Sequence, residues 1–126
     1  MTAPISAEQM QKYKRTARER WQAENQLQAA RRERAWELAR RAAALLKNDY
    51  GVERVVVFGS LTHPGRFNAW SDVDLAAWGL TNANWLKAMG AVRWLDEQGR
   101  IEINLVDVTC CAPGLLAAIE RDGVSV

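Results

Sequence analysis

The sequence predicts an α+β fold, in which a short mixed β-sheet is backed by helices on one side and preceded by a long N-terminal helical arm. Two observations predict it. Between Pro4 and Gly51 the chain has no Gly or Pro and is dominated by Ala, Arg, Glu, Gln and Leu, all strong helix formers. After Gly51, short β-branched runs alternate with segments of helical periodicity, which is typical of small α+β domains.

The N-terminal helical arm, residues 1–48, begins with a helix start signal. Ser6 followed three residues later by Gln9 has the form of a capping box. In the second half an apolar stripe indicates packing on the body; its residues are Leu27, Ala30, Leu38, Ala42 and Leu45, with Trp36 and Leu46 nearby. A helix of this length exceeds what a small body can cover, so it either breaks once or projects and meets a partner.

The charge of the chain is unevenly placed. Residues 1–48 carry 11 Lys or Arg against 5 Glu, whereas residues 49–126 carry 6 against 10 Asp or Glu. The basic residues of the arm are interspersed with Glu, which favours a solvated or protein-binding face over a nucleic-acid interface. Tyr13 and Trp21 lie on one helical face with Met10 and Ala17. They suit a partner protein or a second copy of the chain.

The body, residues 49–126, is predicted from three β-branched runs at 52–58, 73–78 and 101–108. A helix between the last two runs has Trp85, Leu86, Met89, Val92, Trp94 and Leu95 at helical spacing, and Gly99 is its expected stop. A last helix should cover 113–122, with Pro near its first turn and Gly123 past its end.

The composition bounds the class of protein. A chain of 126 residues with 48% hydrophobic and 25% charged residues is typical of one globular domain with a modest core. No apolar run is long enough to cross a bilayer and the N-terminus lacks the pattern of a signal peptide, so we expect a cytoplasmic protein that does not bind membranes. Cys110 and Cys111 are adjacent, which suits neither a disulfide nor, with a single His, a zinc site.

The residues that suggest chemistry follow the first two strands. Gly59 and Ser60 come directly after an apolar run; the Gly allows a phosphate to approach the backbone, and the Ser hydroxyl can donate to it. After eleven further residues come Asp72 and Asp74, which project to one face if they lie on a strand. Two carboxylates this close favour a divalent cation, and Mg²⁺ suits carboxylate oxygens and nucleotide phosphates. A capping Asp72 with a surface Asp74 would leave the Gly-Ser pair unexplained.

This arrangement of an apolar strand, Gly-Ser, eleven residues and Asp-x-Asp resembles the signature of the nucleotidyltransferase superfamily that includes DNA polymerase β. The short length resembles its minimal, MNT-type branch, and the resemblance covers about the last two-thirds of the chain, so that 49–126 would be a minimal nucleotidyltransferase domain. It implies that Gly59 and Ser60 hold the triphosphate of ATP and that Asp72 and Asp74 bind Mg²⁺.

The third carboxylate of that family is absent. The family's last strand aligns on the segment INLVDV and puts Asn104 where an Asp belongs, and Asn cannot act as a base. Glu102 lies two residues earlier on the same strand face and is the candidate substitute, whereas Asp107 should point to the opposite face. We therefore take Asp72, Asp74, Glu102 and Asn104 as the candidate catalytic set.

Four further residues lie near this site in the sequence. Arg66, in the loop before Asp72, is a candidate phosphate ligand. His63, before a Pro, is expected to be a turn residue. Trp70 and Trp78 flank the Asp pair; either could stack on a base, but we expect both to fill core.

Two functions follow from the resemblance. The first is a transferase that moves a nucleoside monophosphate, AMP from ATP, to a hydroxyl of a partner protein; the minimal branch resembles antitoxins whose partner is a HEPN-type ribonuclease toxin, silenced by adenylylation of a tyrosine. The second, favoured by Asn104, is a catalytically impaired module that neutralises a partner by docking. A modifier of small molecules, such as an aminoglycoside nucleotidyltransferase, would need a second domain for its substrate.

Overall fold

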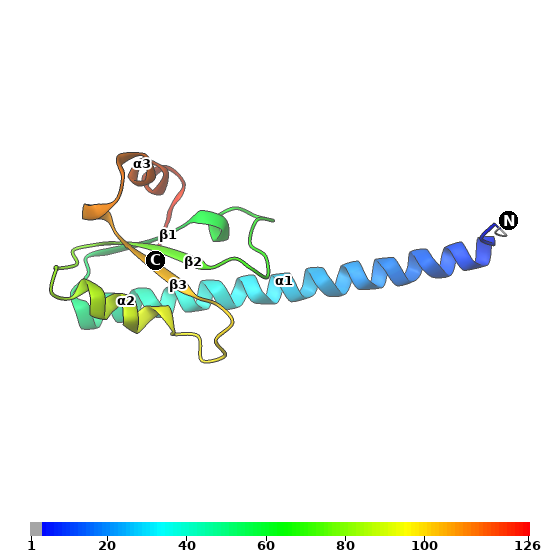
Figure 1. The fold of residues 1–126 in the computed structure, drawn as a ribbon, viewed down its shortest axis with the longest axis horizontal. Helices are drawn as coiled ribbons and strands as arrows, with labels where there is room; N and C mark the ends of the chain where they lie inside the picture. The colour runs from blue at the N-terminus through cyan, green and yellow to red at the C-terminus, as the bar shows by residue number, and fades with distance from the viewer. Residues whose placement is uncertain (1–3) are drawn as a thin grey trace.

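The structure, a computed structural model that describes residues 4–126, is a small body from which one long helix projects (Figure 1). It confirms the α+β fold with a mixed sheet and a long N-terminal helix. The elements in chain order are α1 (Ala7–Tyr50), β1 (Arg54–Phe58), the 3-10 helix η1 (Gly59–Thr62), β2 (Val73–Trp78), α2 (Trp85–Arg93), β3 (Ile103–Asp107), the 3-10 helix η2 (Val108–Cys110), α3 (Pro113–Asp122) and β4 (Val124–Ser125).

Helix α1 is continuous over its 44 residues, so of the two alternatives, a break or a projection, the second is observed. The capping box at Ser6 and Gln9 is present with both of its hydrogen bonds, and Gly51 ends the helix in the left-handed conformation at φ 67°. At 1.5 Å per residue the helix is about 66 Å long. Residues 1–3 of the predicted arm lie outside the described residues.

The second half of α1 packs on the body, as predicted, but the contact begins later than the apolar stripe does. The buried residues of the helix are Ala35, Leu38, Ala39, Ala42, Ala43 and Leu46. Leu27 is 72% exposed and Ala30 is also exposed, so the prediction is wrong for these two residues. Both residues line a hollow with Gln98, Arg100 and Ile101 of the body but do not pack on it.

The sheet has the strand order β3-β2-β1-β4, with β2 and β3 parallel and both pairs formed by β1 antiparallel. Strand β4 was not predicted, because its two residues are too few to show a periodicity. It pairs with Val56 and Val57 and brings the end of the chain onto β1.

Helices cover both faces of the sheet, so the predicted one-sided arrangement is wrong (Figure 1). On one face, Val55, Val57 and Leu75 belong to the main core with α1 and α2. On the other face, Val56 and Ala76 pack with Ile119 of α3 in a second, smaller cluster. Consecutive buried valines in β1 are the sequence sign of a strand covered on both sides.

Helix α2 ends at Arg93, before the predicted stop at Gly99. The chain then turns at residues 96–101, where the carboxylate of Asp96 accepts hydrogen bonds from the backbone N–H groups of Gln98, Arg100 and Ile101. The prediction for α3, in contrast, matches the observed bounds, with Pro113 at its first position. Within residues 4–126, no helix combines the length and the apolar character needed to cross a membrane.

Candidate functional site

Two carboxylates, those of Asp72 and Asp74, lie on one face of the sheet beside the end of β1. Asp74 stands in β2, opposite Phe58 of β1 and Asn104 of β3. Asp72 immediately precedes β2, and the amide nitrogen of Asn104 lies 3.5 Å from Oδ2 of Asp72 and 3.4 Å from Oδ1 of Asp74. One amide reaches both carboxylates only if they share a face, so this part of the prediction is confirmed.

The surrounding protein does not neutralise the charge of this pair. Burial raises the pKa of Asp74, the Asn104 amide lowers it and the charge of Asp72 raises it, with a net result above the ordinary value of 3.8. Among the residues that the structure describes, neither carboxylate takes part in an ion pair. A cation bound between the two would turn their repulsion into attraction.

Gly59 lies so close to Asp74 that a Cβ at this position would displace the carboxylate. Its φ is 78°, in the left-handed region, and a Cβ built on it would stand 2.6 Å from Oδ2 of Asp74. The next residues form η1, which is anchored by the fully buried Leu61 and by a 2.8 Å hydrogen bond from the Thr62 hydroxyl to the Gly59 carbonyl. Ser60 is therefore held, half-buried, next to the aspartate pair.

Asn104 lies in β3 opposite Asp74, and Glu102, the candidate substitute for a third carboxylate, is engaged elsewhere. Glu102 precedes β3, and its carbonyl accepts a 2.9 Å hydrogen bond from the N–H of Val73. Its carboxylate forms a 3.1 Å ion pair with Arg93 at the end of α2. Asp107 lies outside the site, where it is buried and caps η2 through the N–H and hydroxyl groups of Thr109.

The loop between η1 and β2 does not bring its candidate residues onto the aspartates. His63 is a turn residue, as expected: its N–H donates to Ser60 and its carbonyl accepts from Arg66. Arg66 is exposed in this turn, and among the described residues its side chain makes no hydrogen bond or ion pair.

The two tryptophans near the aspartates have different surroundings. The expectation that Trp70 fills core is wrong, because the side chain of Asn68 accepts a 2.8 Å hydrogen bond from the Trp70 N–H in a loop turn and leaves the indole 91% exposed. Trp78 does pack on the core beneath α3, at the far end of β2 from Asp74, with the guanidinium of Arg54 4.2 Å from its ring centroid.

Arg31 of α1 was missed by the sequence reasoning, although it holds the loop that leads to Asp72. Its guanidinium donates to the carbonyls of Asn68, Ser71 and Arg100 at 3.0, 3.0 and 3.1 Å. It also lies 5.6 Å from the ring centroid of Phe67. Because Ser71 adjoins Asp72, this contact ties the position of the carboxylate to α1. No sequence signal distinguishes Arg31 from the other arginines of the arm.

Comparisons with known proteins show that the chain shares its fold with solved structures. No family model and no curated protein matches the chain. Two similar solved structures are crystal structures of mutants of the toxin–antitoxin MntA–HpeT, with 18% and 20% identity and a TM-score of 0.53 each. Each covers 69% of this chain, and 70% and 69% of the matched chains. At this identity the similarity shows a shared fold, and it agrees with the α+β fold that the resemblance to nucleotidyltransferases implied.

The two carboxylates of the aspartate pair suit a cation whose remaining ligands come from water and from the phosphates of a nucleotide. Within the described part of the chain, no group of three or more His, Cys, Asp or Glu side chains could hold a metal by itself. Mg²⁺ is commonly bound by one or two carboxylates, with waters and substrate phosphates as its other ligands. Asp72 and Asp74 meet that requirement, so the residues present fit Mg²⁺ together with a nucleoside triphosphate.

Proposed function

We propose that the chain is a Mg²⁺-dependent nucleotidyltransferase that moves AMP from ATP to a hydroxyl group of a partner protein. The observation that carries the proposal is the approach of Gly59 to Asp74, where a Cβ would stand 2.6 Å from the carboxylate. Gly59 leaves the backbone uncovered beside the two carboxylates. A triphosphate could therefore contact main-chain N–H groups and, at the same time, a cation held by Asp72 and Asp74.

In the proposed reaction the hydroxyl oxygen of the acceptor bonds to the α-phosphorus, and the bond to the bridging oxygen breaks to release pyrophosphate. Asp72 and Asp74 hold the cation, which would supply charge neutralisation at the phosphates and activation of the hydroxyl. The Gly59 backbone and the Ser60 hydroxyl bind the β- and γ-phosphates. Glu102 takes the proton of the acceptor after it leaves its ion pair with Arg93.

The proposed acceptor lies on a separate protein, a HEPN-type toxin of a toxin–antitoxin pair. Two solved structures similar to this chain are those of a toxin–antitoxin, which supports this choice of partner. The 24-residue stretch 7–30 of α1 is exposed throughout, so it is free to contact another chain. The proposed site of action is the cytoplasm, where such a partner would be met.

The test is transfer of label from ATP labelled at the α-phosphate to a candidate toxin in the presence of Mg²⁺. We expect labelled toxin with the natural chain and at least a hundredfold less with Asp72→Asn, because that change keeps the shape of the side chain but removes a metal ligand charge. Asp107→Asn is the matched control and should leave transfer unchanged, since Asp107 caps η2 away from the site.

A second candidate function, a binding module without transfer, is favoured by a specific observation. Asn104 donates toward both aspartates, and the nearest spare carboxylate, Glu102, is paired with Arg93. In this case the chain would neutralise its partner by docking, and Asp72→Asn would not impair neutralisation.

Asn104→Asp separates the two candidates. If the chain is a binding module, label should reach the partner only with Asn104→Asp, which restores the third carboxylate. If it is a transferase, the natural chain should already transfer label and Glu102→Gln should slow it. Arg93→Gln should then accelerate transfer or leave it unchanged, because it frees Glu102 without removing the carboxylate.

A further inference from the structure

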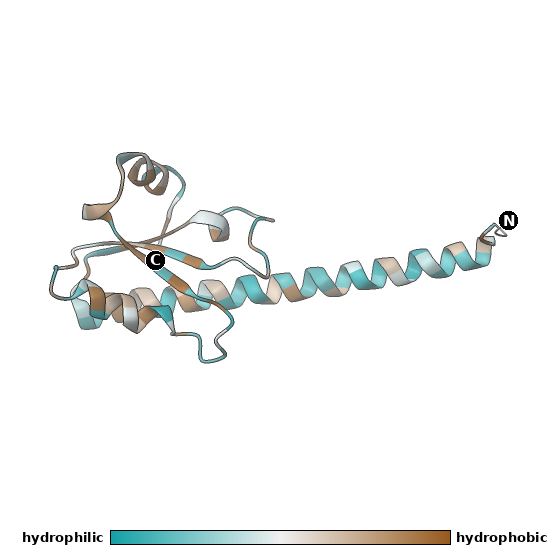
Figure 2. Ribbon diagram, in the orientation of Figure 1, coloured by the Kyte–Doolittle hydropathy of each residue, from teal (hydrophilic) through white to brown (hydrophobic). Residues whose placement is uncertain are grey.

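The exposed part of α1, residues 7–30 and hereafter the free segment, carries one apolar stripe. Tyr13, Trp21 and Leu27 are 72%, 64% and 72% exposed, and Met10 is 39% exposed. Met10, Tyr13, Ala17 and Trp21 follow one another at spacings of three and four residues, and Tyr13 and Trp21 border a hollow in the helix surface. Leu27 continues this face on the side of Arg20 and Glu24. The rest of the free segment is mostly hydrophilic. In Figure 2 it is largely teal or pale, and brown appears only at separate positions along it. An apolar stripe on an otherwise polar projecting helix is typical of a helix that pairs with another.

The stripe continues the helix face that packs on the body. Ala35, Leu38 and Ala42 are buried there, at spacings of three and four residues that extend the series from Met10 to Leu27. A second helix lying on the stripe would therefore run toward the body and end where the body begins. The free segment sets the length of such a partner at about 36 Å.

We infer that the free segment pairs with the free segment of a second copy in an antiparallel two-helix dimer. Seam positions repeat every three and four residues at Met10, Tyr13, Ala17, Arg20, Glu24 and Leu27. Antiparallel pairing about a point between residues 18 and 19 puts Met10 opposite Leu27, Tyr13 opposite Glu24, and Ala17 opposite Arg20. That point is also the midpoint of residues 7–30, so the partner helix, which starts at Ala7, ends beside the first residues that the body covers.

Charge along the seam favours this orientation over a parallel one. A parallel pair in register would set Arg20 against Arg20 and Glu24 against Glu24, which is unfavourable for like charges. The antiparallel pair sets the two Glu24 side chains eleven residues apart along the axis and lets the Tyr13 hydroxyl donate to Glu24 of the second copy. The two Arg20 side chains lie three residues apart along the axis instead of directly opposite each other. Trp21 of one copy enters the hollow beside Ala17 of the other, which Thr16 and Arg20 also line.

The surface available is enough for a reversible dimer. Tyr13 and Trp21 together bury on the order of 300 Å² when covered. Met10, Leu27 and the aliphatic stems of the flanking Lys and Arg residues add a comparable area. The sum, about 600 Å² for each copy, lies below the roughly 800 Å² per partner of a standard interface and at the level of weak, transient complexes. Because Arg20 and Glu24 lie in the seam, we expect dissociation at moderate dilution.

Sedimentation equilibrium of the full chain tests the dimer. We expect half-dimerisation at a concentration on the order of 10 μM, and a shift of at least about tenfold toward monomer with Tyr13→Ala and Trp21→Ala combined. The matched control combines Arg15→Ala and Gln22→Ala on the opposite face of the same helix and should leave the equilibrium unchanged. All four side chains are exposed, so circular dichroism should show each variant folded. A chain that stays monomeric at about 100 μM, or a dimer insensitive to the first pair of changes, overturns the inference.

Disulfide trapping tests the orientation. In a chain with Cys110→Ser and Cys111→Ser, Met10→Cys and Leu27→Cys combined should give an interchain cross-link on mild oxidation. Either change alone should give none, because in the antiparallel dimer residue 10 faces residue 27 of the other copy. Cross-linking by a single change would show a parallel pair and overturn the inferred register. Neither experiment involves nucleotide, so the result is independent of the proposed transferase activity.

Discussion

At the scale of single residues, Gly59 is where the fold and the proposed chemistry meet. Gly59→Ala should lower the free energy of unfolding by about 1–3 kcal/mol. A residue with a Cβ is strained at the left-handed φ of 78°, and this Cβ would clash with the carboxylate of Asp74. It should also weaken the binding of Mg²⁺ with ATP, since the carboxylate of Asp74 has to move. Urea unfolding and titration calorimetry measure the two effects.

Gly90 provides the control for that change. It lies in α2 with nothing within 4 Å of an added Cβ, so Gly90→Ala should stabilise the chain by about 0.5–1 kcal/mol through helix propensity. Equal stability of the two alanine variants would contradict the assigned role of Gly59.

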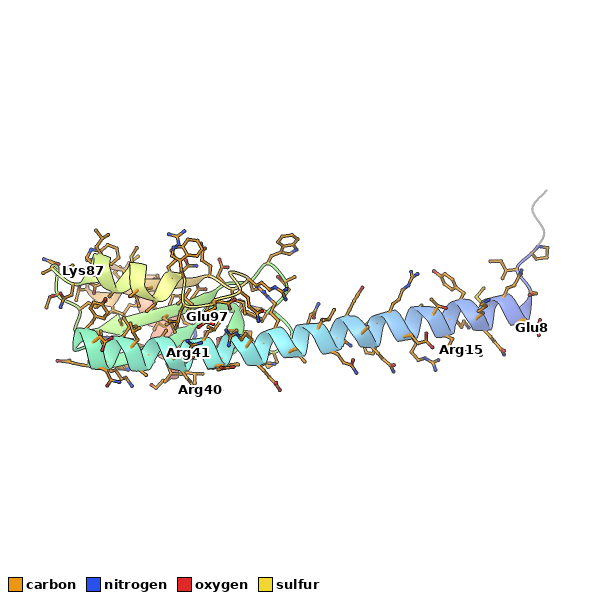
Figure 3. The ribbon with its side chains drawn as sticks, turned by 90° about the horizontal axis from the view of Figure 1, so that it is seen from below. Glu8, Arg15, Arg40, Arg41, Lys87 and Glu97 are labelled. Carbon is orange, nitrogen blue, oxygen red and sulfur yellow. The ribbon has the colours of Figure 1, made fainter. Side chains whose placement is uncertain are left out.

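At the scale of elements, Arg31 joins α1 to the loop before β2. Arg31→Gln should lose the charge-assisted hydrogen bonds to three carbonyls and cost about 2 kcal/mol. Hydrogen exchange of the backbone in residues 68–72 should become faster, which a general loss of stability would not confine to that loop. Arg40→Gln is the control, because Arg40 is exposed on the side of α1 that faces away from the body (Figure 3). Equal exchange in the loop of both variants would contradict the role of Arg31.

Asp96 makes the joint between α1 and the turn after α2 sensitive to acid. Burial raises the pKa of Asp96, but hydrogen bonds from the Gln98 N–H, the Arg34 guanidinium and the N–H groups of Ile101 and Arg100 outweigh it, so the pKa lies below 3.8. A lowered pKa in the folded state adds stability that is complete above the unfolded value and is lost as pH falls from about 3.8 through the folded value.

Asp96→Asn should therefore cost about 2 kcal/mol near pH 7, and the difference from the natural chain should shrink as the pH falls below about 4. Urea unfolding at several pH values measures this difference. Glu97→Gln, a change at the exposed neighbour, should cost little at any pH (Figure 3). A difference between Asp96→Asn and the natural chain that is independent of pH would assign the effect to packing alone.

At the scale of the whole molecule, the features that could be predicted from the sequence are those with a local cause. Ser6 and Pro113 gave correct helix starts, because caps and first-turn prolines act within one turn. The convergence of Asp72 and Asp74 followed from the period of a strand. The hydrogen bonds of Arg31 to the loop and the exposure of Trp70 could not be predicted. Both depend on the conformation that the loop before β2 takes in the tertiary fold.

The whole chain should show two regions of stability along the single helix α1. In dilute solution, amide exchange should be fast in residues 7–30, where no tertiary contact supports the helix, and slow around Leu38 and Leu46, which are fully buried. At concentrations where the inferred dimer forms, protection should extend toward Met10 and leave the body unchanged. With Tyr13→Ala and Trp21→Ala combined, concentration should have no effect on exchange. Slow exchange throughout residues 7–30 at every dilution would mean that the free segment is stable without a partner, and the dimer would then not be what orders it.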